Sequence, residues 1–175
     1  QIANIINVDD EDIIVGSLPL FHAFGIVVTT FLPLIEGIKC VCHPDPTDGL
    51  GLGKLISQYK ATIMTGTSTF FRLYTKNSKV HPLMFESLRL CVAGAEKLRE
   101  DVRYDFKKKF GKDILEGYGT SETSPVAACN LPDVLAPDFS VQVGNKIGTV
   151  GMAIPGTTIK IVNPQTFEEL ATNEE

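Results

Sequence analysis

The chain has 175 residues, of which 43% are hydrophobic and 21% are charged, a composition typical of a globular protein with a buried core. Its formal net charge of −5 at pH 7 argues against nucleic acid as a partner, because phosphate binding usually requires a basic surface. No apolar run reaches the roughly 20 residues that span a bilayer, because Gly25, Pro33, Glu36 and Gly37 interrupt the longest one.

Strand-like and helix-like segments alternate along the first two thirds of the chain. Short segments rich in β-branched residues predict strands at residues 13–19, 38–44, 61–67, 87–95 and 112–119. Helical spacing of apolar residues predicts helices at residues 20–37, 52–60, 68–77 and 97–111. The first of these helices is apolar on nearly all sides, so we expect it to be buried.

This alternation predicts an α/β fold with a mostly parallel sheet that is covered by helices on both faces. Ligands of such sheets bind at the carboxyl ends of the strands. Three of these ends run into glycine and small residues, in the segments TGTSTFF, VAGAEKL and EGYGTSE. We expect the three loops to line one crevice.

The pattern changes after Pro125. A short strand is expected at residues 126–130, then a loop with two prolines at 131–145, and an alternating, half-exposed strand at 157–164. We therefore expect residues 1–125 to form the parallel α/β core of a nucleotide-binding domain, and residues 126–175 to form a loop and the start of a smaller β-rich subdomain. The sequence opens on QIANIINVDDED without a methionine and stops at ATNEE, so we expect a fragment of a larger N-terminal domain.

The segment ILEGYGTSETSPV, residues 114–126, carries the densest chemistry. Glycines on both sides of Tyr118 allow a flat ligand to approach the backbone and lie against the aromatic ring. The Ser121 hydroxyl suits a phosphate oxygen, and the Glu122 carboxylate suits Mg²⁺, which prefers carboxylates together with substrate phosphates. The structural alternative is a glycine-rich turn with a capping box.

Two further segments allow both a structural and a functional interpretation. In VAGAEKL, Gly94 and Ala95 leave room for a planar base, and Glu96 is either a ligand contact or an N-terminal helix charge. In PLFHAFG, His22 is either a hydrogen-bonded core residue or a donor near a substrate carboxylate that borders an apolar pocket.

The chain contains four cysteines. Cys40 and Cys42 flank a valine, so on a strand both side chains point to one face. With His43 beside them a metal site is conceivable, but Cys-x-Cys lacks the usual zinc spacing and no second ligand pair stands elsewhere. We therefore interpret Cys40, Cys42, Cys91 and Cys129 as buried thiols.

Taken in order, PLFHAFG, GTSTFF, VAGAEKL, ILEGYGTSETSP and GTVGMAIPG resemble the nucleotide-binding domain of the adenylate-forming enzymes, the acyl-CoA synthetase and luciferase-like superfamily. The resemblance covers nearly the whole chain, and the Gly-Tyr-Gly-x-Ser/Thr-Glu loop is its most specific element. In four of these segments the residues are most similar to those of the acyl-[acyl-carrier-protein] synthetase part of bacterial bifunctional 2-acylglycerophosphoethanolamine acyltransferases.

The resemblance implies an ATP-dependent ligase of the AMP-forming acid–thiol class. Such enzymes use ATP and Mg²⁺ to convert a carboxylic acid to an acyl-adenylate, and a thiol then takes the acyl group. For the narrower group the acid is a fatty acid and the thiol belongs to acyl carrier protein, which feeds lysophospholipid reacylation. The implied location is the bacterial cytoplasm, with membrane association of the full-length parent at the inner membrane through its other parts.

The resemblance also assigns roles to residues of the chain. Tyr118 would stack on adenine, Ser121 would bind the α-phosphate, Glu122 would hold Mg²⁺, and His22 would lie near the acyl carboxylate or line the acyl pocket. Ser121 stands where threonine is more usual, which keeps the hydroxyl and loses a methyl group. The implied nucleotide-binding residues are Gly94, Ala95, Glu96, Gly117, Tyr118, Gly119, Thr120 and Ser121.

Two alternatives to this ligase assignment stay open, and the sequence disfavours a third. A fatty-acid–coenzyme A ligase would differ only in the acceptor thiol, and a non-catalytic nucleotide-binding module would retain the loops without turnover. A dinucleotide-binding oxidoreductase is disfavoured, because no Gly-x-Gly-x-x-Gly follows a strand and opens a helix. The family's lysine-bearing phosphate loop should precede Gln1 and its Thr-Gly-Asp element should follow Glu175, so we expect the isolated chain to be inactive.

Overall fold

The computed structural model describes residues 1–172, so the final residues of the expected second region, 173–175, lie outside the described residues. Five parallel strands, all described, form the core of the sheet: β1 (Ile13–Gly16), β2 (Lys39–Cys42), β3 (Ile63–Gly66), β4 (Leu90–Ala93) and β5 (Ile114–Tyr118). The order across the described sheet is β2-β1-β3-β4-β5-β6-β9, in which β6 (Ala128–Cys129) and β9 (Met152–Ala153) pair antiparallel. The predicted α/β fold with a mostly parallel sheet is confirmed.

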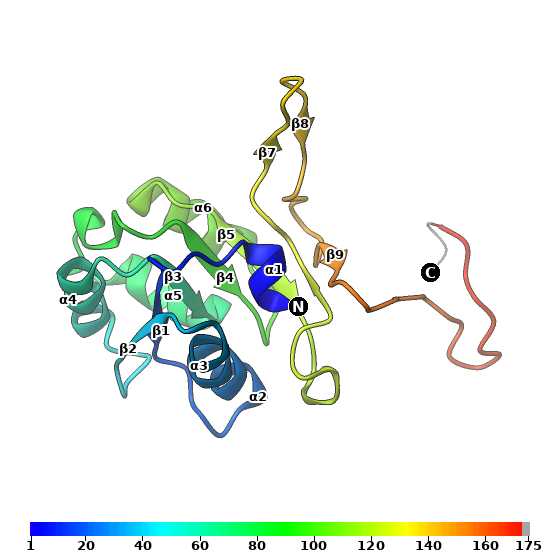
Figure 1. The fold of residues 1–175 in the computed structure, drawn as a ribbon, viewed down its shortest axis with the longest axis horizontal. Helices are drawn as coiled ribbons and strands as arrows, with labels where there is room; N and C mark the ends of the chain where they lie inside the picture. The colour runs from blue at the N-terminus through cyan, green and yellow to red at the C-terminus, as the bar shows by residue number, and fades with distance from the viewer. Residues whose placement is uncertain (173–175) are drawn as a thin grey trace.

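Helices cover both faces of this sheet (Figure 1). One face packs against α4 (Gly49–Tyr59), α5 (Ser68–Lys76), α6 (Glu100–Phe110) and the 3₁₀ turn η2 (Pro82–Phe85). The other face packs against α1 (Ile2–Ile6) and a continuous helical segment made of α2 (Ala23–Ile26), the π-helix η1 (Val27–Phe31) and α3 (Leu32–Glu36). Successive strand residues point to opposite faces of the sheet. Val15 therefore packs on the face that α4, α5 and α6 cover, and Ile14 packs on the face that α1 and α3 cover.

The core beneath α4, α5 and α6 is an aromatic cluster. The rings of Phe71 and Phe106 meet edge to face with centroids 5.1 Å apart, and those of Phe85 and Phe110 stack at 4.4 Å. Tyr74 is buried in the same cluster, and its hydroxyl donates a hydrogen bond of 2.7 Å to the Pro46 carbonyl. A helix cap fixes the start of α4 beside this cluster: the Asp48 side chain accepts a hydrogen bond from the Gly51 N–H.

Two sequence-based expectations need correction. The helix expected to be buried on all sides has one exposed face, where Leu34 and Ile35 are 74% and 76% exposed, because only residues such as Val28 and Leu32 reach the sheet. The strand expected at residues 157–164 is also wrong: of these described residues only Val162 forms a bridge, to Glu169. That segment runs away from the sheet (Figure 1), so within residues 1–172 it pairs with none of the strands of the sheet.

The loop expected at residues 131–145 folds in part into a hairpin of β7 (Val134–Leu135) and β8 (Val141–Gln142), which projects from the body of the molecule (Figure 1). The proposed division at residue 125 stays a prediction. None of the described helices is long and apolar enough to cross a bilayer.

Candidate functional site

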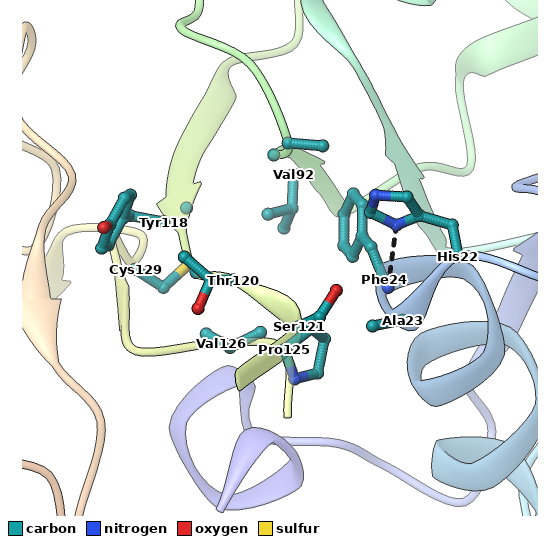
Figure 2. Close-up of a pocket in the computed structure, with 14 residues that line it drawn as sticks. His22, Ala23, Phe24, Val92, Tyr118, Thr120, Ser121, Pro125, Val126 and Cys129 are labelled. Carbon is teal, nitrogen blue, oxygen red and sulfur yellow. Dashed lines mark hydrogen bonds between the residues drawn. The ribbon is translucent and has the colours of Figure 1, made fainter. Parts of the chain in front are cut away.

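A cavity of about 140 Å³ lies at the carboxyl ends of β4 and β5, beside the first turn of α2 (Figure 2). We call it the inner pocket. Its walls combine apolar side chains with the loop that follows β5. They are formed by His22, Ala23, Phe24, Val92, Gly94, Ala95, Gly117, Tyr118, Gly119, Thr120, Ser121, Pro125, Val126 and Cys129.

Two neighbouring hollows adjoin the inner pocket. An outer hollow of about 420 Å³ lies between residues 95–97, residues 116–119 and residues 148–150. An apolar side hollow of about 190 Å³ is bordered by Phe21, Thr67 and Phe70 among others and shares His22, Phe24 and Ala95 with the inner pocket. The expected single crevice is therefore divided: the loops after β4 and β5 line the inner pocket, whereas Thr67 and Phe70 of the segment after β3 border the side hollow.

His22 stands at the start of α2 and lines the inner pocket. Its Nδ1 accepts a hydrogen bond of 3.2 Å from the Phe24 N–H (dashed in Figure 2). Because Nδ1 is the acceptor, the neutral ring carries its proton on Nε2. The side chain is exposed rather than buried, so it is not a core histidine and can offer an N–H to a ligand.

The turn after β4 brings the backbone close to the pocket. The Gly94 N–H donates to the Gly66 carbonyl at 3.0 Å, and a Cβ atom at Gly94 would lie 3.2 Å from two ring atoms of Phe24. Ala95 adopts a φ of 66°, in the left-handed region that L-residues rarely occupy. Ala95 borders the inner pocket and both hollows, so this strained residue lies where the three spaces meet.

The carboxylate of Glu96 already has a structural partner. Its Oε1 accepts a hydrogen bond of 2.6 Å from the Thr69 N–H in the first turn of α5. Burial acts to raise the pKa of Glu96, but hydrogen bonds from Thr69 and Thr67 outweigh it and lower the pKa. Glu96 therefore ties the turn after β4 to α5, and it also borders the outer hollow.

The loop after β5 is a tight turn that closes with a capping box. The Thr123 hydroxyl accepts the Thr120 N–H at 2.9 Å and donates to the Thr120 carbonyl at 2.9 Å, at the ends of the short 3₁₀ helix η3 (Ser121–Thr123). Gly119 has no room for a Cβ, because the Pro125 carbonyl occupies that position. The capping alternative from the sequence is thus realised, and the same turn places Thr120 and Ser121 on the pocket wall (Figure 2).

Tyr118 and Glu122 occupy the rim of the site. The Tyr118 ring is 49% exposed and borders both the inner pocket and the outer hollow. Glu122 is exposed and is not among the residues that line the inner pocket. Its own N–H and the Thr120 hydroxyl lower the pKa of the Glu122 carboxyl below its usual range, so this carboxylate is ionised and accessible.

A buried ion pair supports the floor of the outer hollow. Glu116 accepts hydrogen bonds from the Leu98 N–H at 3.0 Å and from Arg103 Nη2 at 3.3 Å. Both side chains of the pair are buried. The Leu98 contact fixes the segment after β4 to β5, and so holds the two sides of the hollow at a constant separation.

Two residues that shape the site did not emerge from the sequence: Phe24, which lines the inner pocket, and Asn130, which supports the outer hollow. Phe24 lies two positions after His22 in the segment PLFHAFG, but no feature of the neighbouring sequence marks it as a residue of the site. The buried Asn130 donates to the Glu116 and Thr149 carbonyls at 3.2 and 2.6 Å and accepts the Lys146 N–H at 2.9 Å. It thereby holds residues 148–150 against the outer hollow, a role that depends on a contact 19 residues away.

Comparison with known proteins shows the family and the fold of this chain. The family model described as AMP-binding enzyme matches residues 1–175. The long-chain-fatty-acid–CoA ligases of Yersinia pestis and Haemophilus influenzae are each 31% identical, over 151 and 147 residues, which is 86% and 83% of this chain but 25% and 24% of those proteins. The chain thus spans about a quarter of the length of these curated relatives. The ATP-bound structure of MatB from Rhodopseudomonas palustris has the same fold, with a TM-score of 0.79 at 23% identity over 99% of this chain and 32% of that chain.

Proposed function

The chain belongs to the AMP-binding enzyme family, and we propose that it forms part of an ATP-dependent ligase that joins a fatty acid to a thiol through an acyl-adenylate. The observation that carries this proposal is the junction at Ala95, where the inner pocket, with Phe24 and Val92 in its wall, meets the larger outer hollow, which the charged residues Glu96, Lys97 and Glu116 border, beside Tyr118. An acyl-adenylate has the same division, since an apolar acyl group is joined through phosphate to a nucleoside.

In this proposal the outer hollow takes the nucleoside. The Tyr118 residue offers an exposed face for the adenine, and the small residue Ala95 brings the backbone to the other side of the base. The fixed Glu116–Leu98 contact sets the width of the hollow. The ATP bound to MatB, which has the same fold, supports the choice of nucleotide.

The inner pocket takes the part of the acid that is being activated. Phe24, Val92 and Val126 supply apolar walls, and the apolar side hollow gives an acyl chain a way to extend past Phe24. In this proposal His22, which lines the inner pocket, donates its Nε2–H to the carboxylate of the substrate. The long-chain-fatty-acid–CoA ligases among the relatives support a fatty acid as the substrate.

Phosphate and metal contacts fall on the loop after β5. The Ser121 hydroxyl donates to an α-phosphate oxygen from the wall of the inner pocket. Glu122 would hold Mg²⁺, and its ionised, exposed carboxylate is the hard oxygen donor that this ion prefers. The ion would supply positive charge to the phosphate oxygens, while Tyr118 and Ser121 orient the nucleotide.

For the acceptor thiol we propose coenzyme A, because the relatives are named as coenzyme A ligases. Acyl carrier protein, implied by the resemblance to the bifunctional acyltransferases, is the alternative. Competing the two thiols in single-turnover transfer from the acyl-adenylate, in an enzyme that contains this chain, distinguishes them. If the chain were a non-catalytic nucleotide-binding module, the enzyme that contains it would show neither adenylation of the fatty acid nor transfer of the acyl group to a thiol.

Nucleotide affinity tests the nucleoside site directly. In the 175-residue chain, Tyr118→Ala should weaken AMP binding by about 5- to 150-fold, since stacking an aromatic side chain on a base contributes about 1–3 kcal/mol. Isothermal titration calorimetry measures the change. Tyr118→Phe keeps the ring and should bind as the native chain does, and Tyr104→Ala on the exposed face of α6 controls for loss of a surface tyrosine. Equal affinity of the Tyr118→Ala and native chains would contradict the proposal.

Adenylation tests the metal role. In an enzyme that contains this chain, Glu122→Ala should lower fatty-acid-dependent ATP–pyrophosphate exchange by about 100-fold or more, because a preorganised charge near the phosphates is lost. Circular dichroism should show an unchanged fold, since Glu122 is exposed. Full exchange activity in this variant would refute the metal role and leave the nucleoside site standing. The 175-residue chain alone should show almost no exchange.

A further inference from the structure

A pair of thiols lies outside the proposed ligase site, on the edge strand β2. Cys40 and Cys42 point to the same face of this strand, and their sulfur atoms are 3.8 Å apart. Cys42 is exposed and Cys40 is partly exposed, which corrects the expectation that all four cysteines are buried, although Cys91 and Cys129 are. We propose that Cys40 and Cys42 form a binding site for a soft metal ion of the zinc and cadmium class, held by both thiolates.

The separation of the sulfur atoms fits a metal ion better than a disulfide. Two thiolates bound at about 2.3 Å to one tetrahedral ion lie about 3.8 Å apart, and Cys40 and Cys42 already have this spacing. A disulfide requires about 2.05 Å between the sulfurs and closely approaching Cβ atoms. The ion therefore fits the sulfur atoms at their present separation, whereas a disulfide requires them to approach by about 1.7 Å.

The neighbouring strand is shaped to leave room for both sulfurs. Gly16 of β1 pairs with Cys42, and a Cβ atom at Gly16 would lie 2.9 Å from the sulfur of Cys40 and 3.3 Å from that of Cys42. A larger residue at this position would push the two sulfurs out of place. The absence of a Cβ atom at Gly16 thus leaves room for both sulfurs at their present spacing.

The chemistry of the site favours a soft ion with open coordination positions. Thiolates prefer zinc and similar ions to magnesium or calcium. Within residues 1–172 no group of three or more His, Cys, Asp or Glu side chains is placed to hold a metal, so the other positions of the ion face water. The Cys40 S–H donates to the Thr29 carbonyl at 3.4 Å, a contact that binding of the ion breaks. Binding releases this proton and the proton of Cys42 to solvent.

Titration of the reduced 175-residue chain with Cd²⁺ tests the site, because cadmium–thiolate bonds absorb in the ultraviolet. We expect one ion per chain and the release of two protons. Cys40→Ser and Cys42→Ser should each weaken binding by about 100-fold or more, since the second thiolate binds intramolecularly. Cys91→Ala, which removes a buried thiol on β4, should bind as the native chain does.

Each outcome is decisive for the thiol pair and independent of the ligase proposal. The serine variants are close in size to the native residues, so circular dichroism should confirm that they fold. Serine variants that bind Cd²⁺ as tightly as the native chain would overturn the proposal, as would a native chain that binds no ion at micromolar Cd²⁺. AMP affinity of Cys42→Ser should equal that of the native chain, which separates a failure of this site from a failure of the nucleotide site.

Discussion

The parallel core, residues 13–118, and the arm that follows it, residues 126–172, use apolar residues in opposite ways. In the core, strands of four or five residues lie between two layers of helices, and side chains such as Phe71, Tyr74 and Phe106 are fully buried. In the arm, the strands have two residues each, and many large apolar side chains are exposed (Figure 1). These include Val134, Leu135, Phe139, Val141, Val143, Ile147, Ile159, Ile161 and Phe167.

The difference shows that apolar composition alone does not stabilise a segment. Burial stabilises an apolar side chain only when other elements cover it, and two-residue strands in a projecting hairpin have no such cover. The stability of the chain should therefore reside in the core. The candidate site draws on both regions, because residues 148–150 of the arm border a hollow whose other walls belong to the core.

The largest expected effect compares two phenylalanines. Phe106 is fully buried with its ring 5.1 Å from that of Phe71 and 4.8 Å from that of Phe110, so Phe106→Ala should lower the free energy of unfolding by about 3–5 kcal/mol. Phe139 is 81% exposed in the arm, and Phe139→Ala should change it by less than about 0.5 kcal/mol. Urea unfolding measures both, with Phe106→Leu as an intermediate variant. Similar losses at the two positions would break the distinction between core and arm.

The second effect is acid sensitivity of the core. Burial acts to raise the pKa of Asp12, but hydrogen bonds from Arg89 and Thr62 lower it to about 2. An aspartate in the unfolded chain has a pKa of about 3.9. The Asp12 carboxylate therefore stabilises the fold above about pH 4, and this contribution is lost as the pH falls toward 2. The contribution is about 2–3 kcal/mol.

Unfolding curves at several pH values check this sign. Asp12→Asn should lower stability at pH 7 and flatten the loss of stability between pH 4 and pH 2. Asp138→Asn in the arm is the matched control, because Asp138 is exposed and accepts hydrogen bonds from Ser140, two residues away. A native chain whose stability is constant from pH 5 to pH 2 would contradict the role of Asp12.

The smallest effect compares two strained backbones. Ala95 and Phe139 have φ values of 66° and 64°, where glycine is favoured. Ala95→Gly should raise the free energy of unfolding by about 1 kcal/mol, because the turn after β4 unfolds with the core. Phe139→Gly relieves the same strain in the hairpin and should leave the global unfolding midpoint unchanged. Equal shifts of both midpoints would show that the hairpin unfolds together with the core.

Local pattern was enough to predict most of the core. Short segments rich in β-branched residues placed β1 to β5 in order, and their alternation with helices predicted the parallel sheet. The same pattern misjudged the helix at residues 20–37, because an apolar surface does not reveal which of its faces meets the sheet. It also predicted a strand at residues 157–164, because alternation does not show whether a neighbouring strand is present to pair with it.

The sequence by itself determined the order of the elements, the placement of Tyr118, Ser121 and Glu122 on one loop, and the resemblance to the family. Only the tertiary structure decided that Glu96 caps α5, that Asn130 holds residues 148–150, and that Cys40 and Cys42 keep metal-like spacing beside Gly16. Periodicity acts between near neighbours in the chain, so it can be read from the sequence. Side-chain partners such as Thr69 and Glu96 are 27 residues apart, and their contact exists only after the strands and helices between them have packed.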